Sequence, residues 1–153
     1  MIEIRQLMTG EEKTIVPLIR EAFDTHISIS YSAQGVIEFY KYIDVAAIRK
    51  RMQENHEIYT AVSGQAVIGI IELRNNNHIS LLFVKNEHKG TGIGKILLQH
   101  AVDRMTQGGI RQITVNSSPN SIGFYASQGF VPLGAEEVTQ GIRSLSMKLD
   151  LSD

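Results

Sequence analysis

Two kinds of hydrophobic pattern follow one another in the first third of the chain. Apolar residues alternate loosely with polar ones over residues 2–7, which predicts a first strand. Over residues 11–23 they recur at three- and four-residue steps after two acidic residues, which predicts an amphipathic helix with Thr9 as its cap. A second helical region is predicted after Ser32, with a restart at Asp44 as a further cap.

The middle of the chain carries the clearest β pattern. Runs rich in β-branched residues, divided by Ser-Gly and Asn-rich turns of hairpin length, predict a three-stranded meander over residues 57–62, 66–73 and 78–84. Helical spacing then returns between Gly92 and Gln107, and two glycines end that helix.

In the last third of the chain the pattern predicts one strand, one short helix and two closing strands. They are a strand over 111–117, a short helix over 117–128, and strands over 129–133 and 144–151. No repeat, low-complexity segment or linker divides the chain. The pattern therefore predicts one domain over residues 1–153, with a mixed α/β sheet and helices on both of its faces. Residues 26–35 fit a loop beside a pocket as well as a plain connection.

Composition narrows the classes of function. The 153 residues are 42% hydrophobic, which suits one buried core, and a formal charge of -1 without blocks of either sign gives no sign of a nucleic-acid surface. The lack of cysteine excludes thiolate catalysis and cysteine-bound metals, and the five histidines have no paired spacing for a metal. The acidic N-terminus and the absence of a long apolar run predict a cytoplasmic protein without a membrane segment.

The stretch HKGTGIGKILL, residues 88–98, places three glycines between an apolar strand and a helix N-terminus. Free backbone N–H groups at such an end favour anions. The phosphate loop of nucleoside triphosphatases needs a glycine and a Ser or Thr where this chain has Lys89 and Ile96. A dinucleotide loop needs its third glycine where Lys95 stands, and no acidic residue follows about twenty residues later. The spacing therefore argues against both nucleotide patterns.

Residues 89–94, KGTGIG, resemble the Gln/Arg-x-x-Gly-x-Gly/Ala signature of the Gcn5-related N-acetyltransferase (GNAT) superfamily, with lysine at the first position. The strand and helix on either side of the loop, and FYASQGF at 124–130, are also similar to that family. The resemblance covers about residues 58–149. It implies an α/β (α+β) three-layer fold with a mixed, mostly antiparallel sheet of about seven strands, about four helices, and a splayed parallel strand pair that holds acetyl-CoA.

In that family the loop amides hold the pyrophosphate of acetyl-CoA, and the pantetheine amides bond to the exposed edge of the strand before the loop. The resemblance therefore implies cofactor-binding roles for Phe83, Val84, Lys89, Gly90, Thr91, Gly92, Ile93, Gly94, Lys95 and Asn116. Lysine at position 89 keeps the positive charge but lacks the planar fork of arginine. No metal is implied.

Acyl transfer to an amine needs a deprotonated amine and a proton for the departing thiolate. Tyr125 occupies the position of the family's catalytic tyrosine, and a phenol is a suitable acid for an alkyl thiolate. His78 and Glu72 are rival candidates for the base, and the absence of a dedicated base is the third possibility. His78 is expected to share a strand face with Leu82 and Val84, whereas Glu72 either faces solvent or points into the active-site cleft.

The expected reaction is N-acetylation of a primary amine of a small molecule or peptide, by direct attack in a ternary complex. The alternatives are a CoA-binding regulatory or sensor domain without catalysis, and a nucleotide-phosphate binder of another fold. Candidates for the substrate pocket are Phe23, Tyr31 and Phe39, and Glu136 and Glu137, in a predicted loop, would favour a cationic amine. No nucleic-acid or membrane partner is expected, and a homodimer is possible because dimers are common in this family.

Overall fold

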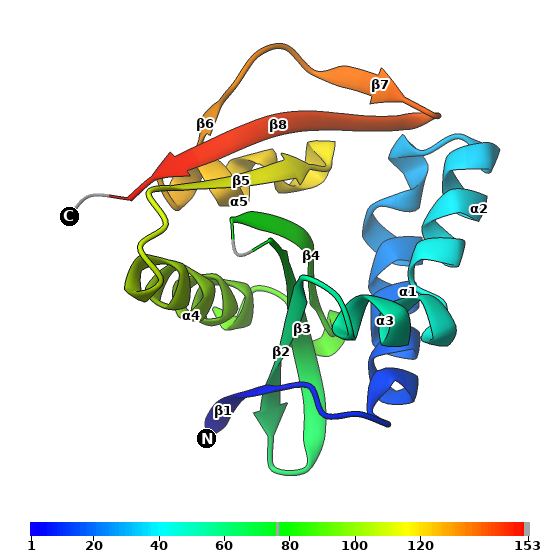
Figure 1. Ribbon diagram of the computed structural model, residues 1–153. Coiled ribbons are helices and arrows are strands. Elements are labelled where there is room, and N and C mark those ends of the chain that lie inside the picture. Colours follow the sequence, from blue (N-terminus) through cyan, green and yellow to red (C-terminus); the bar gives the residue numbers. More distant parts are fainter. Residues whose placement is uncertain (76, 152–153) are drawn as a thin grey trace.

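The computed structural model describes residues 1–75 and 77–151. Within these ranges, eight strands form a mixed sheet in the order β1-β2-β3-β4-β5-β8-β6, with β7 paired to β8 (Figure 1). Neighbouring strands are antiparallel except β4 and β5, which run parallel. The strands are β1 (Ile2–Gln6), β2 (His56–Ser63), β3 (Ala66–Arg74), β4 (His78–Val84), β5 (Gln112–Ser117), β6 (Val131–Pro132), β7 (Glu137–Thr139) and β8 (Ile142–Asp150).

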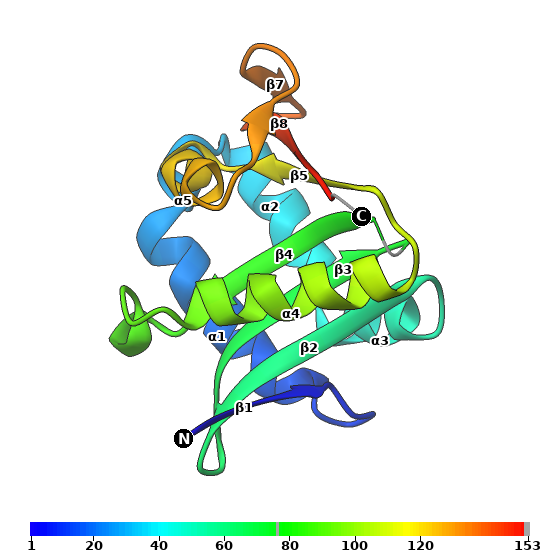
Figure 2. The same ribbon diagram turned by 90° about the vertical axis from the view of Figure 1, so that its left-hand side faces the viewer.

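Helices cover both faces of the sheet, so that the molecule has three layers (Figures 1 and 2). One face carries the first three helices, and the other carries the last two. Over the described residues these are α1 (Glu12–His26), α2 (Ala33–Tyr42), α3 (Val45–Met52), α4 (Ile93–Gln107) and α5 (Ile122–Ser127), with the 3-10 turns η1 (Ser28–Ser30), η2 (Asn86–His88) and η3 (Pro119–Ser121).

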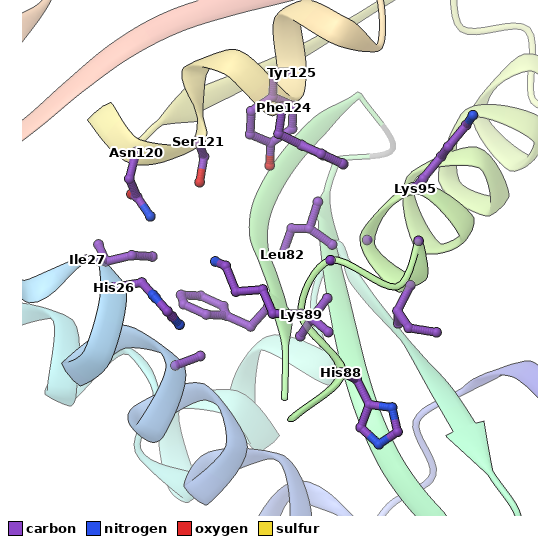
Figure 3. A pocket seen from close by; sticks show the side chains of 17 residues that line it. His26, Ile27, Leu82, His88, Lys89, Lys95, Asn120, Ser121, Phe124 and Tyr125 are labelled. Carbon is purple, nitrogen blue, oxygen red and sulfur yellow. The ribbon is translucent and has the colours of Figure 1, made fainter. Parts of the chain in front are cut away.

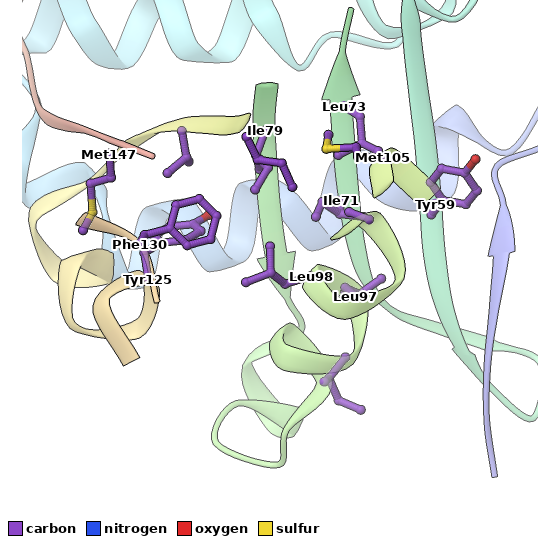
Figure 4. Close-up of a cluster of buried hydrophobic side chains, with 14 of the residues drawn as sticks. Tyr59, Ile71, Leu73, Ile79, Leu97, Leu98, Met105, Tyr125, Phe130 and Met147 are labelled. Atoms are coloured by element: carbon purple, nitrogen blue, oxygen red, sulfur yellow. The ribbon is translucent and has the colours of Figure 1, made fainter. Parts of the chain in front are cut away.

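Each face of the sheet has its own hydrophobic cluster. On one side, Leu97 of α4 belongs to a buried cluster with Ile71 and Ile79 (Figure 4). On the other side, Phe23 of α1 is buried in a cluster with Ile70. Successive residues of β3 therefore enter opposite cores, which explains why AVIGIIEL is apolar almost throughout instead of alternating.

The parallel pair β4–β5 is joined only at one end. His78 is opposite Thr114 and Ile79 is opposite Val115, and no further pair follows among the described residues. The two strands therefore part along the rest of β4, as the family resemblance predicted.

A register shift in the β3–β4 ladder lies where the strands part. Leu73 is opposite Ile79 and Glu72 is opposite Leu81, so Ser80 is the extra residue of a β-bulge. In a regular strand residues 79 and 81 would share a face, yet Ile79 enters the cluster beneath α4 and Leu81 enters the cluster beneath α1. The bulge thus reverses the two faces of β4 for every residue after it.

Most predicted elements are confirmed, with small differences at the ends. The meander is β2–β4, and α4 and β5 lie where the sequence placed them. The prediction that Glu136 and Glu137 both lie in a loop is wrong for Glu137, because β7 begins at this residue. This strand has three exposed residues and no buried side chain, so it leaves no hydrophobic pattern. Over the described residues the sheet therefore has eight strands instead of about seven, and there are five α-helices instead of about four.

Of the two predicted helix caps, Asp44 is confirmed and Thr9 is not. The side chains of Ser32 and Asp44 accept hydrogen bonds from the first turns of α2 and α3. Thr9 does not cap α1, because the carboxylates of Glu11 and Glu12 turn back to accept the N–H groups of the preceding turn. These N–H groups precede the helix, so no side chain caps α1, although Glu12 in its first turn favours the positive end of the helix dipole.

Candidate active site

The glycine loop connects β4 to α4 through η2, and its backbone takes a shape that requires glycine. Gly90 has φ of 80° and Gly92 has φ of 89°, both in the left-handed region that other residues rarely adopt. Gly94 lies in the first turn of α4, where an added Cβ would stand 3.6 Å from Phe124. Two of the three glycines are therefore set by backbone geometry.

This loop leaves a row of backbone N–H groups without partners. Among the described residues, the N–H groups of Gly90 and of residues 92–95 donate to no acceptor, and the Ile96 N–H is the first to donate within the helix, to the Gly92 carbonyl at 3.0 Å. Such groups at a helix N-terminus bind anions, and the helix dipole adds to the attraction.

A cavity adjoins this row of amides; we call it the loop cavity. Its lining includes the loop, residues 82–84 of β4, His26, Asn120, Ser121 and Tyr125 (Figure 3). The ammonium group of Lys89 reaches across the cavity, whereas the Lys95 side chain points away from it (Figure 3). His26, Asn120 and Ser121 were not predicted from the sequence, because the end of α1 and the turn η3 are far apart along the chain and share no motif.

The backbone groups on the free edge of β4 belong to Leu82 and Val84, whereas Phe83 and Val84 were expected. The Lys85 N–H bonds to the Ile68 carbonyl on β3, and backbone groups alternate in direction along a strand. The backbone of Phe83 therefore faces its β3 partner, while the N–H and C=O groups of Leu82 and Val84 face the gap beside β5. Of the two residues expected to offer their backbone to the cofactor, only Val84 has its backbone groups on the free edge, because adjacent residues of a strand direct these groups to opposite sides.

Tyr125 lies on α5 and is 5% exposed. Its ring packs edge-on against Phe124 and Phe130, with centroid distances of 5.2 and 5.3 Å. Figure 3 shows its hydroxyl directed toward the loop cavity, and no described residue bonds to that hydroxyl. Burial raises the pKa of Tyr125 above that of a free phenol, so the hydroxyl keeps its proton at neutral pH.

Two further cavities extend the loop cavity across the sheet. We call the first the throat: it lies between the parted strands, and its lining includes residues 79–83 of β4, residues 115–117 of β5, Ser118 and Tyr125. We call the second the outer cavity; Tyr42, Ser80, Asn116 and residues of β7 and β8 are among its lining residues. The throat shares lining residues with both neighbours, so the three cavities lie next to one another from the glycine loop to the outer cavity; we call this row of cavities the passage.

The predicted substrate-pocket residues fall into two groups. Tyr31 and Phe39 line both the throat and the outer cavity. Phe23 lines neither, because it is fully buried and stacks on Phe39 with a centroid distance of 4.0 Å. Asn116 lies at the predicted lip of β5, where its Oδ1 accepts a hydrogen bond from Ser146.

Acidic side chains also reach the outer cavity. Glu137 of β7 lines it, as does Glu38 of α2, whereas Glu136 is paired with Arg143 at 2.7 Å. Glu38 has Lys41 near it at 3.4 Å. Glu38 was not predicted to lie at the site, because α2 is distant in the sequence from the strands with which it lines this cavity.

His78 lies at the joined end of the parallel pair and lines none of the three cavities. Its Nδ1 is 2.7 Å from the Thr114 hydroxyl. Burial, with a smaller effect of Arg74, lowers its pKa to about 4. The prediction that His78 shares a face with Leu82 and Val84 is wrong, since the bulge lies between them and those two pack beside the α4 cluster with Ile79.

Glu72 is fully buried, so neither of its two predicted orientations is correct. Its carboxylate accepts hydrogen bonds from Arg51 at 2.7 and 3.1 Å and lies 2.6 Å from His56 Nδ1. Arg51 also stacks over the Tyr42 ring at 3.7 Å. This network fixes α3 to the sheet, and Glu72 lines none of the three cavities.

No three His, Asp or Glu side chains among the described residues lie close enough to hold a metal ion. No helix in the described ranges has the length and apolar character that crossing a bilayer requires.

Known proteins share this sequence pattern and fold. A curated relative, the peptidyl-lysine N-acetyltransferase YjaB of Salmonella typhimurium, is 25% identical over 139 residues, which are 90% of this chain and 89% of the relative. A Gcn5-related N-acetyltransferase from Rhodopseudomonas palustris superposes with a TM-score of 0.86 at 18% identity, covering 97% of this chain and 95% of that one. The PaiA N-acetyltransferase of Thermoplasma acidophilum, solved with coenzyme A, gives 0.82 at 23% identity and 99% of both chains.

The family itself follows from a match that spans most of the chain. Residues 27–151 match the model of the acetyltransferase (GNAT) domain, and this range includes the glycine loop, the parted strands and Tyr125. The chain therefore belongs to the GNAT family of acetyltransferases.

Proposed function

We propose that this protein is an acetyl-CoA-dependent N-acetyltransferase that acetylates a primary amine by direct attack within a ternary complex. The observation that carries the proposal is the passage. It places side by side a loop with free N–H groups, a free strand edge, a protonated tyrosine and an outer cavity lined by residues of four strands and a helix. The coenzyme A bound to the Thermoplasma relative supports the choice of cofactor.

The residues present suit the two halves of acetyl-CoA. The free N–H groups of residues 92–95 hold the pyrophosphate, and the Lys89 ammonium group adds a positive charge over the same cavity. The backbone groups of Leu82 and Val84 bond to the pantetheine amides in the manner of an added strand. This direction of binding brings the thioester into the throat.

Tyr125 is the proton donor in this proposal. Acetyl-CoA supplies the acetyl group as a thioester, whose C–S bond breaks as the new C–N bond forms. The Tyr125 hydroxyl lines both the loop cavity and the throat, and it carries a proton at neutral pH. It donates that proton to the departing sulfur and regains one from solvent, so the net change is one proton moved from nitrogen to sulfur.

The acceptor amine loses its proton without a dedicated base. Neither His78 nor Glu72 lines the passage, and the Glu72 carboxylate is occupied by Arg51 and His56. The amine therefore enters uncharged and releases its second proton to water. Because an alkyl amine has a pKa of about 10.4, kcat/KM is expected to rise steadily between pH 7 and pH 9.

The class of acceptor is a primary amine of a small molecule or peptide. Tyr31 and Phe39 would pack against its carbon chain, and Glu137 would attract a cationic group at the rim. The name of the Salmonella relative makes a lysine side chain of a peptide the first acceptor to examine.

A panel of amines tests the proposal. Purified protein is mixed with acetyl-CoA and one of Nα-acetyl-lysine amide, a lysine-containing peptide, spermidine, an aminoglycoside or an alanyl peptide; CoA release and product mass are measured. At least one amine should gain a single acetyl group on nitrogen. CoA binding in calorimetry without any transfer would instead favour a regulatory CoA-binding domain, and tighter binding of ATP than of CoA would contradict both.

A further inference from the structure

The side chain of Asn86, the first residue of η2, connects the glycine loop to α1. Its amide nitrogen donates hydrogen bonds to the Glu21 carboxylate at 3.2 Å and to the Thr25 hydroxyl at 3.1 Å. Its Oδ1 lies 3.1 Å from Nε2 of His26. We call these three contacts the Asn86 clip. All three partners lie at least 60 residues away along the chain, so the clip is a tertiary contact and not part of a local turn.

The chemistry of the partners sets the direction of each bond in the clip. A carboxylate accepts hydrogen bonds and donates none, so the amide nitrogen of Asn86 faces Glu21 and Oδ1 faces His26. Because Oδ1 cannot donate, the imidazole carries a proton on Nε2 and donates it to Asn86. A flipped amide would turn its oxygen toward the carboxylate and lose these bonds. The clip therefore uses both N–H groups and the oxygen of one side chain.

The clip is the polar attachment of the glycine loop to the rest of the fold. Among the described residues 86–92, no side chain other than that of Asn86 reaches another helix or strand through a hydrogen bond or ion pair. The backbone bonds of η2 are internal turns, from the His88 N–H to the Lys85 carbonyl at 2.8 Å and from the Lys89 N–H to the Asn86 carbonyl at 3.2 Å. These turns give the loop its shape, whereas the clip gives it a place beside α1.

The two segments that the clip joins form facing walls of the loop cavity. The glycine loop lines one side, and Ala22, His26 and Ile27 at the end of α1 line the other. Figure 3 shows His26 and Ile27 on the α1 side, with the Lys89 side chain directed toward them from the loop. A fixed separation of α1 and η2 therefore fixes the width of this cavity.

We propose that Asn86 is a positioning residue for the cofactor. It holds the glycine loop at the distance from α1 at which the free N–H groups of residues 92–95 and the Lys89 ammonium group meet the pyrophosphate of CoA together. This inference rests on the proposed function for the location of the pyrophosphate. Asn86 does not line the loop cavity and acts through the loop. Because the clip forms before the cofactor arrives, less conformational entropy is lost when CoA binds.

The experiment breaks the clip in two ways and restores it in one. Asn86→Ala removes the clip without adding a charge. Asn86→Asp places a carboxylate against that of Glu21, and Glu21→Gln added to the same chain supplies an amide donor opposite it, so that the bond reforms with its direction reversed. Gln99→Glu is the matched control. Gln99 also donates an amide N–H to a carboxylate, that of Asp103 at 2.9 Å, but on an exposed face of α4 outside the three cavities.

Asn86→Ala should raise the Kd for CoA in calorimetry and the KM for acetyl-CoA about fivefold, while kcat and the amine KM stay within about twofold of the wild type. Asn86→Asp should weaken CoA binding at least as much, and the double variant with Glu21→Gln should return the Kd to within about twofold of the wild type. Gln99→Glu should leave the Kd unchanged. S-Acetylpantetheine lacks the pyrophosphate, so its kcat/KM should be equal in all these proteins.

Three outcomes would overturn the inference. The first is an Asn86→Ala protein that binds CoA as tightly as the wild type. The second is an Asn86→Asp protein whose CoA affinity Glu21→Gln does not restore. The third is an equal loss of kcat/KM for S-acetylpantetheine, because the damage would then extend beyond the loop to the whole site.

The two proposals fail in different ways, because the Kd comparisons need no turnover. Acetylation of an amine by a protein whose CoA affinity does not depend on Asn86 contradicts this inference alone. CoA affinity that depends on Asn86 and is restored by Glu21→Gln, in a protein that acetylates no amine, contradicts the proposed function alone. A wild-type protein that does not bind CoA contradicts both.

Discussion

Burial acts on Tyr125 and His78 with the same consequence, which is that each side chain is uncharged at neutral pH. It raises the pKa of the tyrosine and lowers that of the histidine to about 4. The difference between them is location, since the phenol lines the passage and the imidazole is bonded to Thr114 outside it. Both side chains are of a type that can transfer a proton. Only Tyr125 is placed where a substrate could receive that proton.

Replacing Tyr125 by phenylalanine tests the proton donor. The variant should lower kcat about 100-fold, because the thiolate then leaves without a positioned acid. The KM for acetyl-CoA and the Tm should hardly change, because the hydroxyl has no hydrogen-bond partner among the described residues. Steady-state kinetics with thermal melting measures all three, and a kcat within twofold of the wild type would exclude Tyr125 as the acid.

Stability should depend on pH through His78. Its folded pKa, about 4, is below its unfolded value near 6.5, so between these values the unfolded chain binds more protons than the folded one. The free energy of unfolding should therefore rise with pH through this window and fall on acidification. In His78→Asn, which can still bond to Thr114, the Tm difference between pH 7 and pH 5 should become smaller; an equal difference in both proteins would contradict the assignment.

At the scale of an element, the ends and interruptions of regular structure build the site. The positive φ angles of Gly90 and Gly92 turn the loop so that the first N–H groups of α4 face the cavity, and the bulge in β4 sets which backbone groups lie on the free edge. Elsewhere the buried pair of Arg51 and Glu72 ties α3 to the sheet. The loop and the bulge are thus departures from regular helix and strand geometry, and the pair connects a regular helix to a regular strand.

Gly92→Ala should weaken CoA binding through the backbone alone. No atom lies within 4 Å of a Cβ added there, so the cost is the left-handed conformation, about 1–2 kcal/mol for an alanine. Relief of that strain would shift the amides, and calorimetry should give a CoA Kd at least about tenfold higher. Gly134→Ala is the matched control, because that glycine also has free space but no positive φ, and its CoA affinity should equal that of the wild type.

Glu72→Gln should act on stability and leave the chemistry intact. Arg51 would lose its counter-charge inside the protein, which typically costs about 3–5 kcal/mol. Urea denaturation should show this loss, while kcat per folded molecule stays within about twofold. A fall in kcat by two orders of magnitude in protein that is still folded would instead restore Glu72 as a base.

At the scale of the whole molecule, the sheet consists of two parts joined weakly in the middle. Strands β1–β4 pair along their length, as do β5 and β8, but among the described residues two residue pairs alone connect β4 to β5. The passage runs between the two parts. A ligand bound there contacts both, and its binding energy adds to the stability of the folded state.

Coenzyme A should therefore change amide exchange along β4 in an alternating pattern. In the free protein the N–H groups of Leu82 and Val84 should exchange quickly, and that of Phe83 slowly, because only Phe83 faces β3. Saturating CoA should slow exchange at Leu82 and Val84 and raise stability by about 2.7 kcal/mol at 100 times its Kd. Exchange measured by NMR that is equal at all three residues, with or without CoA, would refute this strand edge.

Features set by local pattern could be predicted from the sequence. The meander, α4 and its glycine loop follow from hydrophobic periodicity and the conformational needs of glycine, which involve residues a few positions apart. The spacing KGTGIG, with FYASQGF farther along, was enough to predict the family and a splayed parallel pair. These properties depend on short-range geometry that is already present in one segment of chain.

Only the tertiary structure decided which side chains meet. Glu72 in an apolar run gave no sign of its partners, since Arg51 and His56 come from other elements, and Phe23 was indistinguishable from Phe39 until α1 and α2 packed together. The bulge at Ser80 reverses the faces of β4, so alternation counted along the sequence placed His78 with the wrong neighbours. Burial, pairing and the shape of a cavity arise from contacts between distant segments, and a pattern read along one segment does not contain them.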